Sequence, residues 1–440
     1  MKIAVAGTGY VGLVTGVALA SIGHNVTCVD VDENKIKLMQ KGISPIYEND
    51  LENLMQKNKE RLTYTTDYKN AYKNADVIII GVGTPERADG SANLDYVFGV
   101  AKQIAESVEN DCVVVVKSTV PIGTNDNVEE YLNENCKEGI KISVASNPEF
   151  LAQGTAVRDT LFASRIVIGA ENDETKKKLS KMYEPLTLEP YNVPLLTTNR
   201  RSAEMIKYAS NDFLALKISY INEIANLCEK LGANIEDVTK GMGYDSRIGN
   251  KFLNAGIGYG GSCFPKDTKA LHWLSVSEGV ELKTIKACIE VNKSQKIKLY
   301  EKLKQDINSL KNKNIAILGL TFKPGTDDLR EAPSIDNIEL LLDAGANIRA
   351  YDPISIESFK KKIAYKLEED GIIGTISFFD SIDETIKNAD AALIMTEWPE
   401  IRDYEISNYK KLMRVPRVYD GRNCYKIEDT KEIIYRSIGR

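Results

Sequence analysis

Histidine is nearly absent from this chain of 440 residues, which contains only His24 and His272. A reaction that needs a histidine base, or a metal site built from several histidines, therefore has few candidate residues. The seven cysteines form an odd set without paired short spacings, which favours a reducing compartment and disfavours structural zinc. We therefore expect no metal site, and we expect the chemistry to depend on cysteine, lysine, aspartate and glutamate.

Long hydrophobic runs and blocks of positive charge are also lacking. No apolar stretch reaches the length that spans a membrane, and residues 1–7 enter a strand-like run rather than a cleavable signal. The net charge is -6, and lysine and arginine are spread along the chain. These features predict a cytoplasmic protein with a small-molecule substrate, and they argue against nucleic-acid and membrane partners.

The length predicts two or three domains, and the apolar pattern indicates where they lie. Short β-branched runs separated by helix-length segments predict a parallel sheet, with strands at 2–7, 25–30, 76–82 and 112–119 and further strands from 141 and 165. Residues 200–231 hold a 3.6-residue apolar period without proline or glycine and predict one long helix that ends at Gly232. Further helical patterns cover 234–240, 267–278 and 282–309.

A second α/β region begins at residue 313 and echoes the first. The runs NIAILGL from 314, NIRAYDP from 347 and NADAALIMTEWPE from 388 repeat the patterns of KIAVAG, NVTCVDV and NADVIIIGVGTPE. We therefore predict an α/β protein with two doubly wound, Rossmann-like domains joined by a central helical region. The predicted boundaries are 1–199, 200–310 and 311–440.

A glycine-rich fingerprint follows the first predicted strand. The segment GTGYVG opens a helix and contains, in order, Gly7, Gly9, Tyr10, Val11 and Gly12. Glycines at these positions permit a tight turn, a close approach of the backbone to a pyrophosphate, and close packing of helix on strand. Asp30 closes the next strand, where a carboxylate suits ribose hydroxyls and repels the additional phosphate of NADP. We therefore expect NAD as the cofactor.

Other residues near the predicted cofactor site have two interpretations. Asp32 competes with Asp30, but it better suits the cap of the following helix. Lys35 either lines the adenosine pocket or is a solvated charge on that helix. Three residues after the next strands either touch the nicotinamide half or serve the turns there: Thr84, Pro85 and Thr119.

The most unusual segment is GIGYGGSCFPKD at 256–267. It places Cys263 before a helix that we expect to start near Asp267, so the helix dipole and Lys266 would both favour the thiolate. Lys207 and Asn211 are four apart on the long helix and share a face, where an ammonium and an amide suit a developing oxyanion. Each residue also has a structural interpretation. Cys263 would then be a buried structural cysteine, Lys207 a solvated lysine, and Asp267 an aspartate that only caps its helix.

Taken together, the motifs resemble the UDP-glucose/GDP-mannose dehydrogenase family. The matching segments are GTGYVG at 7, VDVDENKI at 29, GVGTP at 81, STVPIGT at 118, SNPEFLAQGTA at 146, KYASNDF at 207, SRIGNKF at 246, GGSCFPKD at 260 and GLTFKPGTDDLRE at 319. The resemblance implies a homodimer that oxidises UDP-glucose to UDP-glucuronate with NAD, with GDP-mannose as the alternative substrate. Relatives that act on N-acetylated UDP-sugars carry a histidine where this chain has Ser262.

The resemblance also implies roles for individual residues. Cys263 would be the nucleophile, carrying a thiohemiacetal and then a thioester while two NAD are consumed. Around the reacting carbon would lie Lys207, Asn211, Asp267 and Thr119, with Glu149 assisting hydrolysis and Arg330 near the cofactor. The substrate would contact Phe150, Leu151, Lys207, Asn211, Arg247, Phe252, Tyr259, Gly260, Lys323 and Arg422. The family usually has a second glutamate where this chain has Gln153.

Overall fold

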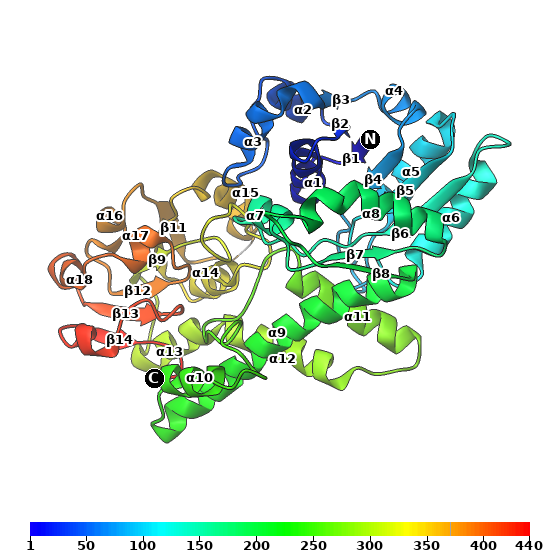
Figure 1. Ribbon diagram of the computed structural model, residues 1–440. Helices are drawn as coiled ribbons and strands as arrows, with labels where there is room; N and C mark the ends of the chain where they lie inside the picture. The colour runs from blue at the N-terminus through cyan, green and yellow to red at the C-terminus, as the bar shows by residue number, and fades with distance from the viewer. Residues whose placement is uncertain (370) are drawn as a thin grey trace. The chain divides into compact units, whose positions relative to one another are not determined.

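The computed structural model describes residues 1–369 and 371–440 and is an α/β structure (Figure 1). The chain folds into two compact units, Met1–Ser210 and Asn211–Arg440. Each unit contains one sheet with the strand order of a doubly wound fold. The predicted pair of Rossmann-like sheets is therefore confirmed, whereas the domain boundaries at 199 and 310 stay predictions.

The first unit contains an eight-stranded sheet in the order β3-β2-β1-β4-β5-β6-β7-β8. The strands are β1 (Lys2–Ala6), β2 (Asn25–Val29), β3 (Leu62–Thr65), β4 (Val77–Ile80), β5 (Cys112–Val116), β6 (Ile142–Ser146), β7 (Ile166–Gly169) and β8 (Leu195–Thr198). Strands β1 to β6 pair in parallel. The sheet therefore has its switch point between β1 and β4, where such folds bind nucleotides.

Strand β7 continues the sheet as predicted, but its direction was predicted wrongly. It pairs antiparallel with β6, through Ser146 and Gly169 alone. The helix between these strands, α7 (Ala156–Leu161), has six residues. An apolar run in the sequence predicts a buried strand but does not specify its direction.

Helices cover both faces of the first sheet. They are α1 (Tyr10–Ser21), α2 (Glu33–Gln40), α3 (Leu51–Lys57), α4 (Tyr68–Lys73), α5 (Asp95–Ser107), α6 (Thr124–Asn135), α7 and α8 (Asp173–Thr187). Alternate residues of β5 belong to two apolar clusters: Val115 to the cluster that includes residues of α1, α3 and α8, and Val114 to the cluster that includes residues of α4, α5 and α6. Both faces of the inner strands are buried, so these strands are continuous apolar runs in the sequence.

The second unit repeats the strand order in a six-stranded parallel sheet, β11-β10-β9-β12-β13-β14. The strands are β9 (Asn314–Leu318), β10 (Asn347–Tyr351), β11 (Thr375–Phe378), β12 (Ala391–Ile394), β13 (Arg417–Asp420) and β14 (Ile434–Arg436). Strand β9 is central, as β1 is in the first sheet, and β10 and β12 are its neighbours. The echo between the two halves of the sequence is therefore confirmed.

The helices of the central and C-terminal segments are α9 (Arg200–Leu231), α10 (Ile235–Gly243), α11 (Phe264–Ser277), α12 (Lys283–Lys296), α13 (Lys298–Asp306), α14 (Pro333–Asp343), α15 (Ile356–Leu367), α16 (Ile382–Ile386), α17 (Pro399–Arg402) and α18 (Ile406–Leu412). The long helix predicted over 200–231 is confirmed at both ends. The predicted helix over 282–309 is two helices that meet at Ile297. None of the described helices is long and apolar enough to cross a membrane.

Candidate active site

A glycine and three polar residues directly follow four strands of the first unit. Gly7 comes directly after β1, and Asp30 directly after β2. Lys117 and Asn147 come directly after β5 and β6. The carboxyl ends of parallel strands lie along one edge of a sheet, and ligands of doubly wound folds bind at that edge.

Two of the three fingerprint glycines are required by packing, and the third is not. Gly7 has a φ of 92°, and a Cβ at Gly12 would lie 2.0 Å from the carbonyl oxygen of Gly7. At Gly9, in contrast, a Cβ would meet no atom of the described chain within 4 Å. Tyr10 and Val11 begin α1, whose first turn has no acidic residue and no side-chain cap. The helix terminus beside Gly9 therefore suits a pyrophosphate.

Asp30 is held in place by the fingerprint turn. Its Oδ2 accepts hydrogen bonds from the backbone N–H and the hydroxyl of Thr8, at 2.8 and 2.5 Å. Burial acts to raise the pKa of Asp30, but hydrogen bonds from Thr8 and Asp32, with the charge of Lys35, outweigh it and lower the pKa. Asp32 caps α2 by accepting from the backbone N–H groups of Asn34 and Lys35, which confirms the cap expected from the sequence.

The segments after β4 and β5 are joined by a hydrogen bond. The buried Thr84 hydroxyl donates to the carbonyl oxygen of Thr119 at 2.8 Å. The backbone carbonyl of Pro85 accepts a hydrogen bond from the backbone N–H of Asn93, in the segment between β4 and α5. The structure therefore brings Thr84 and Thr119 together, two residues that were predicted to touch the nicotinamide half.

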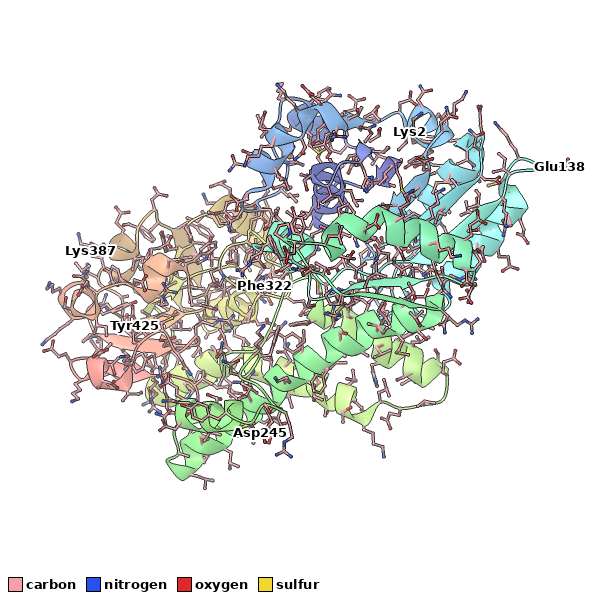
Figure 2. The ribbon with its side chains drawn as sticks, viewed as in Figure 1. Lys2, Glu138, Asp245, Phe322, Lys387 and Tyr425 are labelled. Atoms are coloured by element: carbon pink, nitrogen blue, oxygen red, sulfur yellow. The ribbon has the colours of Figure 1, made fainter. Side chains whose placement is uncertain are left out.

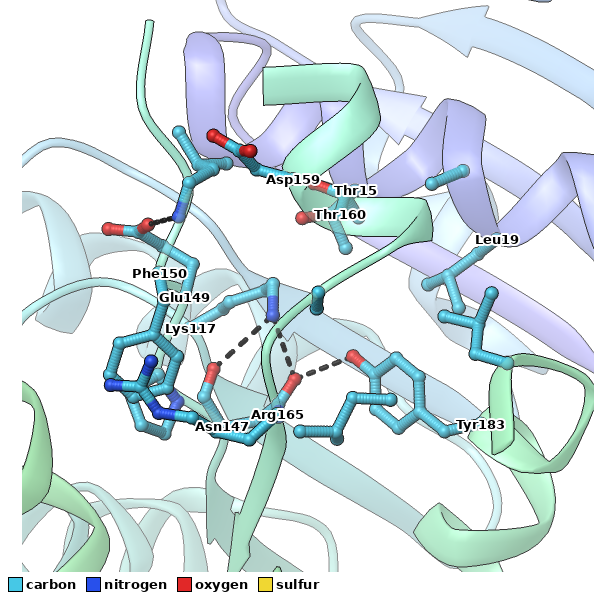
Figure 3. Close-up of a pocket in the computed structure, with 16 residues that line it drawn as sticks. Thr15, Leu19, Lys117, Asn147, Glu149, Phe150, Asp159, Thr160, Arg165 and Tyr183 are labelled. Carbon is cyan, nitrogen blue, oxygen red and sulfur yellow. Dashed lines mark hydrogen bonds between the residues drawn. The ribbon is translucent and has the colours of Figure 1, made fainter. Parts of the chain in front are cut away.

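Glu149 forms a buried ion pair with Lys207 of α9. The Nζ–Oε1 distance is 2.7 Å, and both side chains are almost fully buried. The second carboxylate oxygen of Glu149 accepts from the backbone N–H of Leu151 at 2.8 Å. The ring of Phe150 lies under the guanidinium of Arg165, 3.5 Å from its centroid, as Figure 3 shows. These contacts place Glu149, Phe150 and Leu151 around one small cavity of the first unit.

Cys263 occupies the N-cap position of α11, which begins at Phe264 and not near Asp267. The helix starts early because Pro265 fits a first turn, where a missing backbone N–H costs no hydrogen bond. The thiol is half-buried, and its sulfur lies 3.7 Å from the hydroxyl oxygen of Ser262. A cysteine at a helix N-terminus is in a position that favours the thiolate.

Asp267 is an interior residue of α11, so the interpretation of it as a helix cap is wrong. Its carboxylate accepts from the side-chain amide of Asn211 at 2.7 Å and from the ammonium of Lys266 at 2.6 Å. Lys266 is thus bound to this carboxylate, and its expected effect on the thiol of Cys263 stays a prediction. Asp267 is fully buried, and its position is fixed from two sides.

The glycine-rich segment before Cys263 is packed and buried, unlike a flexible linker. A Cβ at Gly260 would lie 2.3 Å from the carbonyl oxygen of Glu331, and a Cβ at Gly261 would lie 2.7 Å from the ring of Phe322. The backbone N–H of Gly261 donates to the carbonyl of Arg330 at 2.7 Å. These close contacts explain the glycine pair and fix the direction in which the chain enters Cys263.

A groove of the second unit is lined by five of the ten residues predicted to bind substrate. The predicted residues that line it are Phe252, Tyr259, Gly260, Lys323 and Arg422. Phe322, labelled in Figure 2, lies on the same groove. The guanidinium of Arg422 donates to the carbonyl groups of Gly258, Phe322 and Met395 and forms an ion pair with Glu397 at 3.3 Å. These contacts hold Arg422 in one orientation beside the groove.

Arg247 was predicted to contact the substrate and Arg330 to lie near the cofactor, and in the structure each pairs with an aspartate. Arg247 is exposed, and its guanidinium forms a bidentate pair with Asp245. It is not among the residues that line the groove. Arg330 is largely exposed and is paired in the same way with Asp328. Roles for Arg247 and Arg330 therefore stay predictions.

Three buried polar residues were missed by the sequence analysis. Lys117 and Asn147 lie at adjacent strand ends and are hydrogen-bonded to each other. Asp212 follows Asn211 on α9 and is 1% exposed, and both of its carboxylate oxygens lack a hydrogen-bond partner among the described residues. Nothing in the sequence pattern around these three residues indicates that their side chains are buried.

Comparison with known proteins agrees with this arrangement. Three models of the UDP-glucose/GDP-mannose dehydrogenase family match the chain: its NAD binding domain over residues 1–187, its central domain over 201–294, and its UDP binding domain over 316–427. The chain belongs to this family. The matched NAD binding domain contains the fingerprint and Asp30, and the matched central domain contains Lys207, Asn211, Cys263 and Asp267.

Individual members of the family are similar over their whole length. UDP-glucose 6-dehydrogenase YwqF of Bacillus subtilis is 48% identical, across 100% of this chain and 98% of that protein. The structure of a UDP-glucose dehydrogenase from Pyrobaculum islandicum matches with a TM-score of 0.90 at 34% identity, covering 99% of this chain and 96% of that one. The structure of a UDP-D-ManNAc dehydrogenase from Pyrococcus horikoshii matches with a TM-score of 0.86 at 27% identity, covering 100% and 99%.

Proposed function

We propose that this chain oxidises UDP-glucose to UDP-glucuronate, using two NAD for each sugar and forming a thiohemiacetal and then a thioester on Cys263. The observation that carries the proposal is the placement of Cys263. It lies at the start of α11, at the end of a tightly packed glycine segment and one turn before the Asn211–Asp267 pair. A nucleophile and fixed polar groups within one turn of helix suit covalent catalysis.

The residues of the first unit fit NAD. Gly9 leaves room for the pyrophosphate at the start of α1, and Asp30 lies at the end of β2 for the ribose hydroxyls. Thr84 and Thr119 follow the next two strands and would hold the nicotinamide half. NAD supplies a hydride acceptor, and converting a primary alcohol to a carboxylate removes two hydrides, so two NAD are needed.

Cys263 is the residue that prevents release of the aldehyde. After the first oxidation its sulfur adds to the aldehyde carbon, a C–S bond forms, and the carbonyl oxygen takes a proton. Loss of the second hydride and of that proton leaves a thioester. Water then adds to the thioester carbon, the C–S bond breaks, and the thiolate of Cys263 leaves while the product keeps a carboxylate.

Lys207, Asn211, Asp267 and Glu149 assist these steps. Lys207 and Asn211 offer an ammonium and an amide to the oxyanions that form at the reacting carbon. Asp267 takes the proton of the alcohol, and Glu149 orients and deprotonates the water that cleaves the thioester. The ion pair of Glu149 with Lys207, and the bonds of Asp267 to Asn211 and Lys266, hold the two carboxylates in place for these proton transfers.

The groove of the second unit is the site that we assign to the nucleotide sugar. It has the aromatic side chains of Phe252, Tyr259 and Phe322 and the cations of Lys323 and Arg422. Aromatic rings suit the uracil base, and cations suit the diphosphate. Relatives that use N-acetylated sugars have a histidine at the position of Ser262. We propose that Ser262 contributes to the preference for UDP-glucose.

A homodimer is the assembly that we propose. Helix α9 exposes Phe213, Tyr220 and Leu227, which are spaced seven apart and are each at least half exposed. A stripe with this spacing is typical of helices that pack against another helix. Sedimentation velocity tests the proposal, and a monomer at micromolar concentration would contradict it.

The decisive experiment supplies NAD with UDP-glucose, GDP-mannose, UDP-N-acetylglucosamine or UDP-N-acetylmannosamine in separate reactions and measures NADH and sugar consumed. We expect UDP-glucose to be preferred, with two NADH formed for each sugar. Faster turnover of GDP-mannose would overturn the substrate and keep the mechanism. One NADH per sugar with free aldehyde would overturn the covalent mechanism.

A further inference from the structure

A buried lysine joins two strand ends in the first unit. Lys117 follows β5 and is 7% exposed. Its ammonium donates to the side-chain oxygen of Asn147 at 3.0 Å and lies 3.5 Å from the carbonyl oxygen of the same residue, as Figure 3 shows. Burying an ammonium is costly, so a lysine in this position indicates a purpose beyond packing.

Asn147 makes this lysine part of a wider bridge. Its side-chain oxygen also accepts from the hydroxyl of Tyr183 on α8 at 2.6 Å, and its side-chain nitrogen donates to the carbonyl of Val167 in β7 at 2.7 Å. Strands β6 and β7 are otherwise paired only through Ser146 and Gly169. The Asn147 side chain therefore fixes the end of β6 at the point where the sheet has the fewest backbone hydrogen bonds.

The bridge holds two segments that carry proposed site residues. Lys117 lies two residues before Thr119, and Asn147 lies two residues before Glu149. The Lys117–Asn147 hydrogen bond thus links the segment after β5 to the segment after β6. Movement of Asn147 would displace Glu149 together with its ion pair to Lys207.

Lys117 also places a second positive charge near Glu149. Burial first, and the charge of Lys207 to a smaller extent, lower the pKa of Lys117 to about 8 against the attraction of Glu149, which raises it. The other titratable residues that line this cavity are Asp159, Arg165 and Tyr183. One carboxylate, Glu149, thus lies in the field of two lysines.

We propose that Lys117 is a positioning residue for thioester hydrolysis, which holds Glu149 in place through Asn147 and adds positive charge beside it. The inference rests on the proposed function, because it needs a thioester on Cys263 to hydrolyse. The charge of Lys117 is present below a pH of about 8 and is lost above it. Hydrolysis should therefore slow as the pH rises through this value, whereas direct attack by hydroxide would accelerate.

The test compares Lys117→Met, Lys117→Arg and Tyr183→Phe with the wild type. Methionine keeps an unbranched side chain that is one heavy atom shorter and removes the charge, and arginine keeps a charge that does not titrate. Tyr183→Phe is the matched control, because it removes the other hydrogen bond to the same Asn147 oxygen without changing any charge. Thermal unfolding and NADH titration accompany each variant.

The readouts are single-turnover NADH formation and the intact mass of the chain from pH 6 to 9.5. We expect Lys117→Met to slow hydrolysis on the order of 100-fold, the size of effect that misplacement of a reacting group produces. The thioester adduct should persist, while the NADH burst is slowed far less. Lys117→Arg should recover part of the rate and lose the decline above pH 8.

Three outcomes would overturn the inference. The first is a normal rate of hydrolysis in Lys117→Met. The second is an equal loss of the NADH burst, of NAD affinity and of hydrolysis in that variant, because a merely structural role of Lys117 predicts equal losses. The third outcome applies if Lys117→Met does not fold. In that case a hydrolysis rate of the wild type that rises steadily through pH 8 overturns the inference. Wild-type chain that forms no NADH and no adduct with UDP-glucose would instead refute the proposed function itself.

Discussion

The ammonium of Lys207 lies 2.7 Å from the carboxylate of Glu149, and both groups are buried. Lys207 and Asn211 share a face of α9, and the sequence suggested that they converge on one oxygen. In the structure each is bound to a different carboxylate, Lys207 to Glu149 and Asn211 to Asp267. These two carboxylates thus fix the orientations of the Lys207 and Asn211 side chains.

Replacement of Glu149 by glutamine should slow thioester hydrolysis and leave an adduct on Cys263. Glutamine keeps the shape of the side chain but cannot take a proton from water. It also removes the carboxylate that pairs with the buried ammonium of Lys207, and loss of one member of such a pair costs about 3–5 kcal/mol. Intact-mass measurement after one turnover and urea unfolding check the two effects.

Gln153→Glu is the control for this variant. The side chain at 153 is only half-buried and follows Glu149 in the same segment, so an added charge there remains in contact with water. We expect little change in rate and no adduct. A normal rate without adduct in Glu149→Gln would assign the hydrolytic role to another residue.

Replacement of Cys263 by alanine should abolish formation of the acid and leave NAD binding intact. The cysteine belongs to the second unit, whereas the fingerprint and Asp30 belong to the first. Fluorescence titration with NADH and detection of UDP-glucuronate measure the two properties. Equal losses of cofactor affinity and turnover would mean that Cys263 has a structural role.

Asp30→Ala should weaken NAD binding by about 1–3 kcal/mol, the size of a lost hydrogen bond to a charged group. The variant also removes the acceptor for Thr8. Asp32→Ala is the matched control, because it removes the cap of α2 and should cost about 0.5–2 kcal/mol of stability while NAD affinity is retained. Unchanged NAD affinity in Asp30→Ala would remove Asp30 from the site.

The sequence was informative where burial and local geometry impose a pattern on it. Strands β1, β4 and β5 are buried on both faces, so they are continuous apolar runs. Helix α9 was predicted to the residue, because its period is unbroken and Gly232 with a φ of 73° ends it. Cys263 was predicted as a site residue because it precedes a helix and lies near Lys266, a setting that favours the thiolate.

What the sequence did not predict depends on contacts between distant segments. Strands β3, β8 and β14 are short and partly exposed, so they lack an apolar run. The antiparallel direction of β7 depends on its pairing with β6, which the apolar pattern does not specify. Lys117 and Asp212 look like ordinary surface charges in the sequence, and only the packing around them shows that they are buried.

Asp212→Asn should stabilise the chain, and more so as the pH rises. Asp212 is 1% exposed, and neither carboxylate oxygen has a hydrogen-bond partner among the described residues. Burial first, and the nearby Asp267 second, raise the pKa of Asp212 to about 8, with Lys266 acting in the opposite direction. In the unfolded chain an aspartate titrates near 3.9.

The folded chain therefore binds one more proton than the unfolded chain between these two values, so its stability falls as the pH rises from about 4 to about 8. Asparagine has the same shape and does not titrate, so its advantage should grow across this interval, reaching a few kcal/mol, and be constant above it. Urea unfolding at pH 5, 6, 7 and 8.5 measures the difference. Asp237→Asn, at an exposed position of α10, is the control, because its carboxylate contacts water in both states. A difference between Asp212→Asn and wild type that is equal at pH 5 and 8.5 would show that Asp212 does not carry a proton in the folded chain.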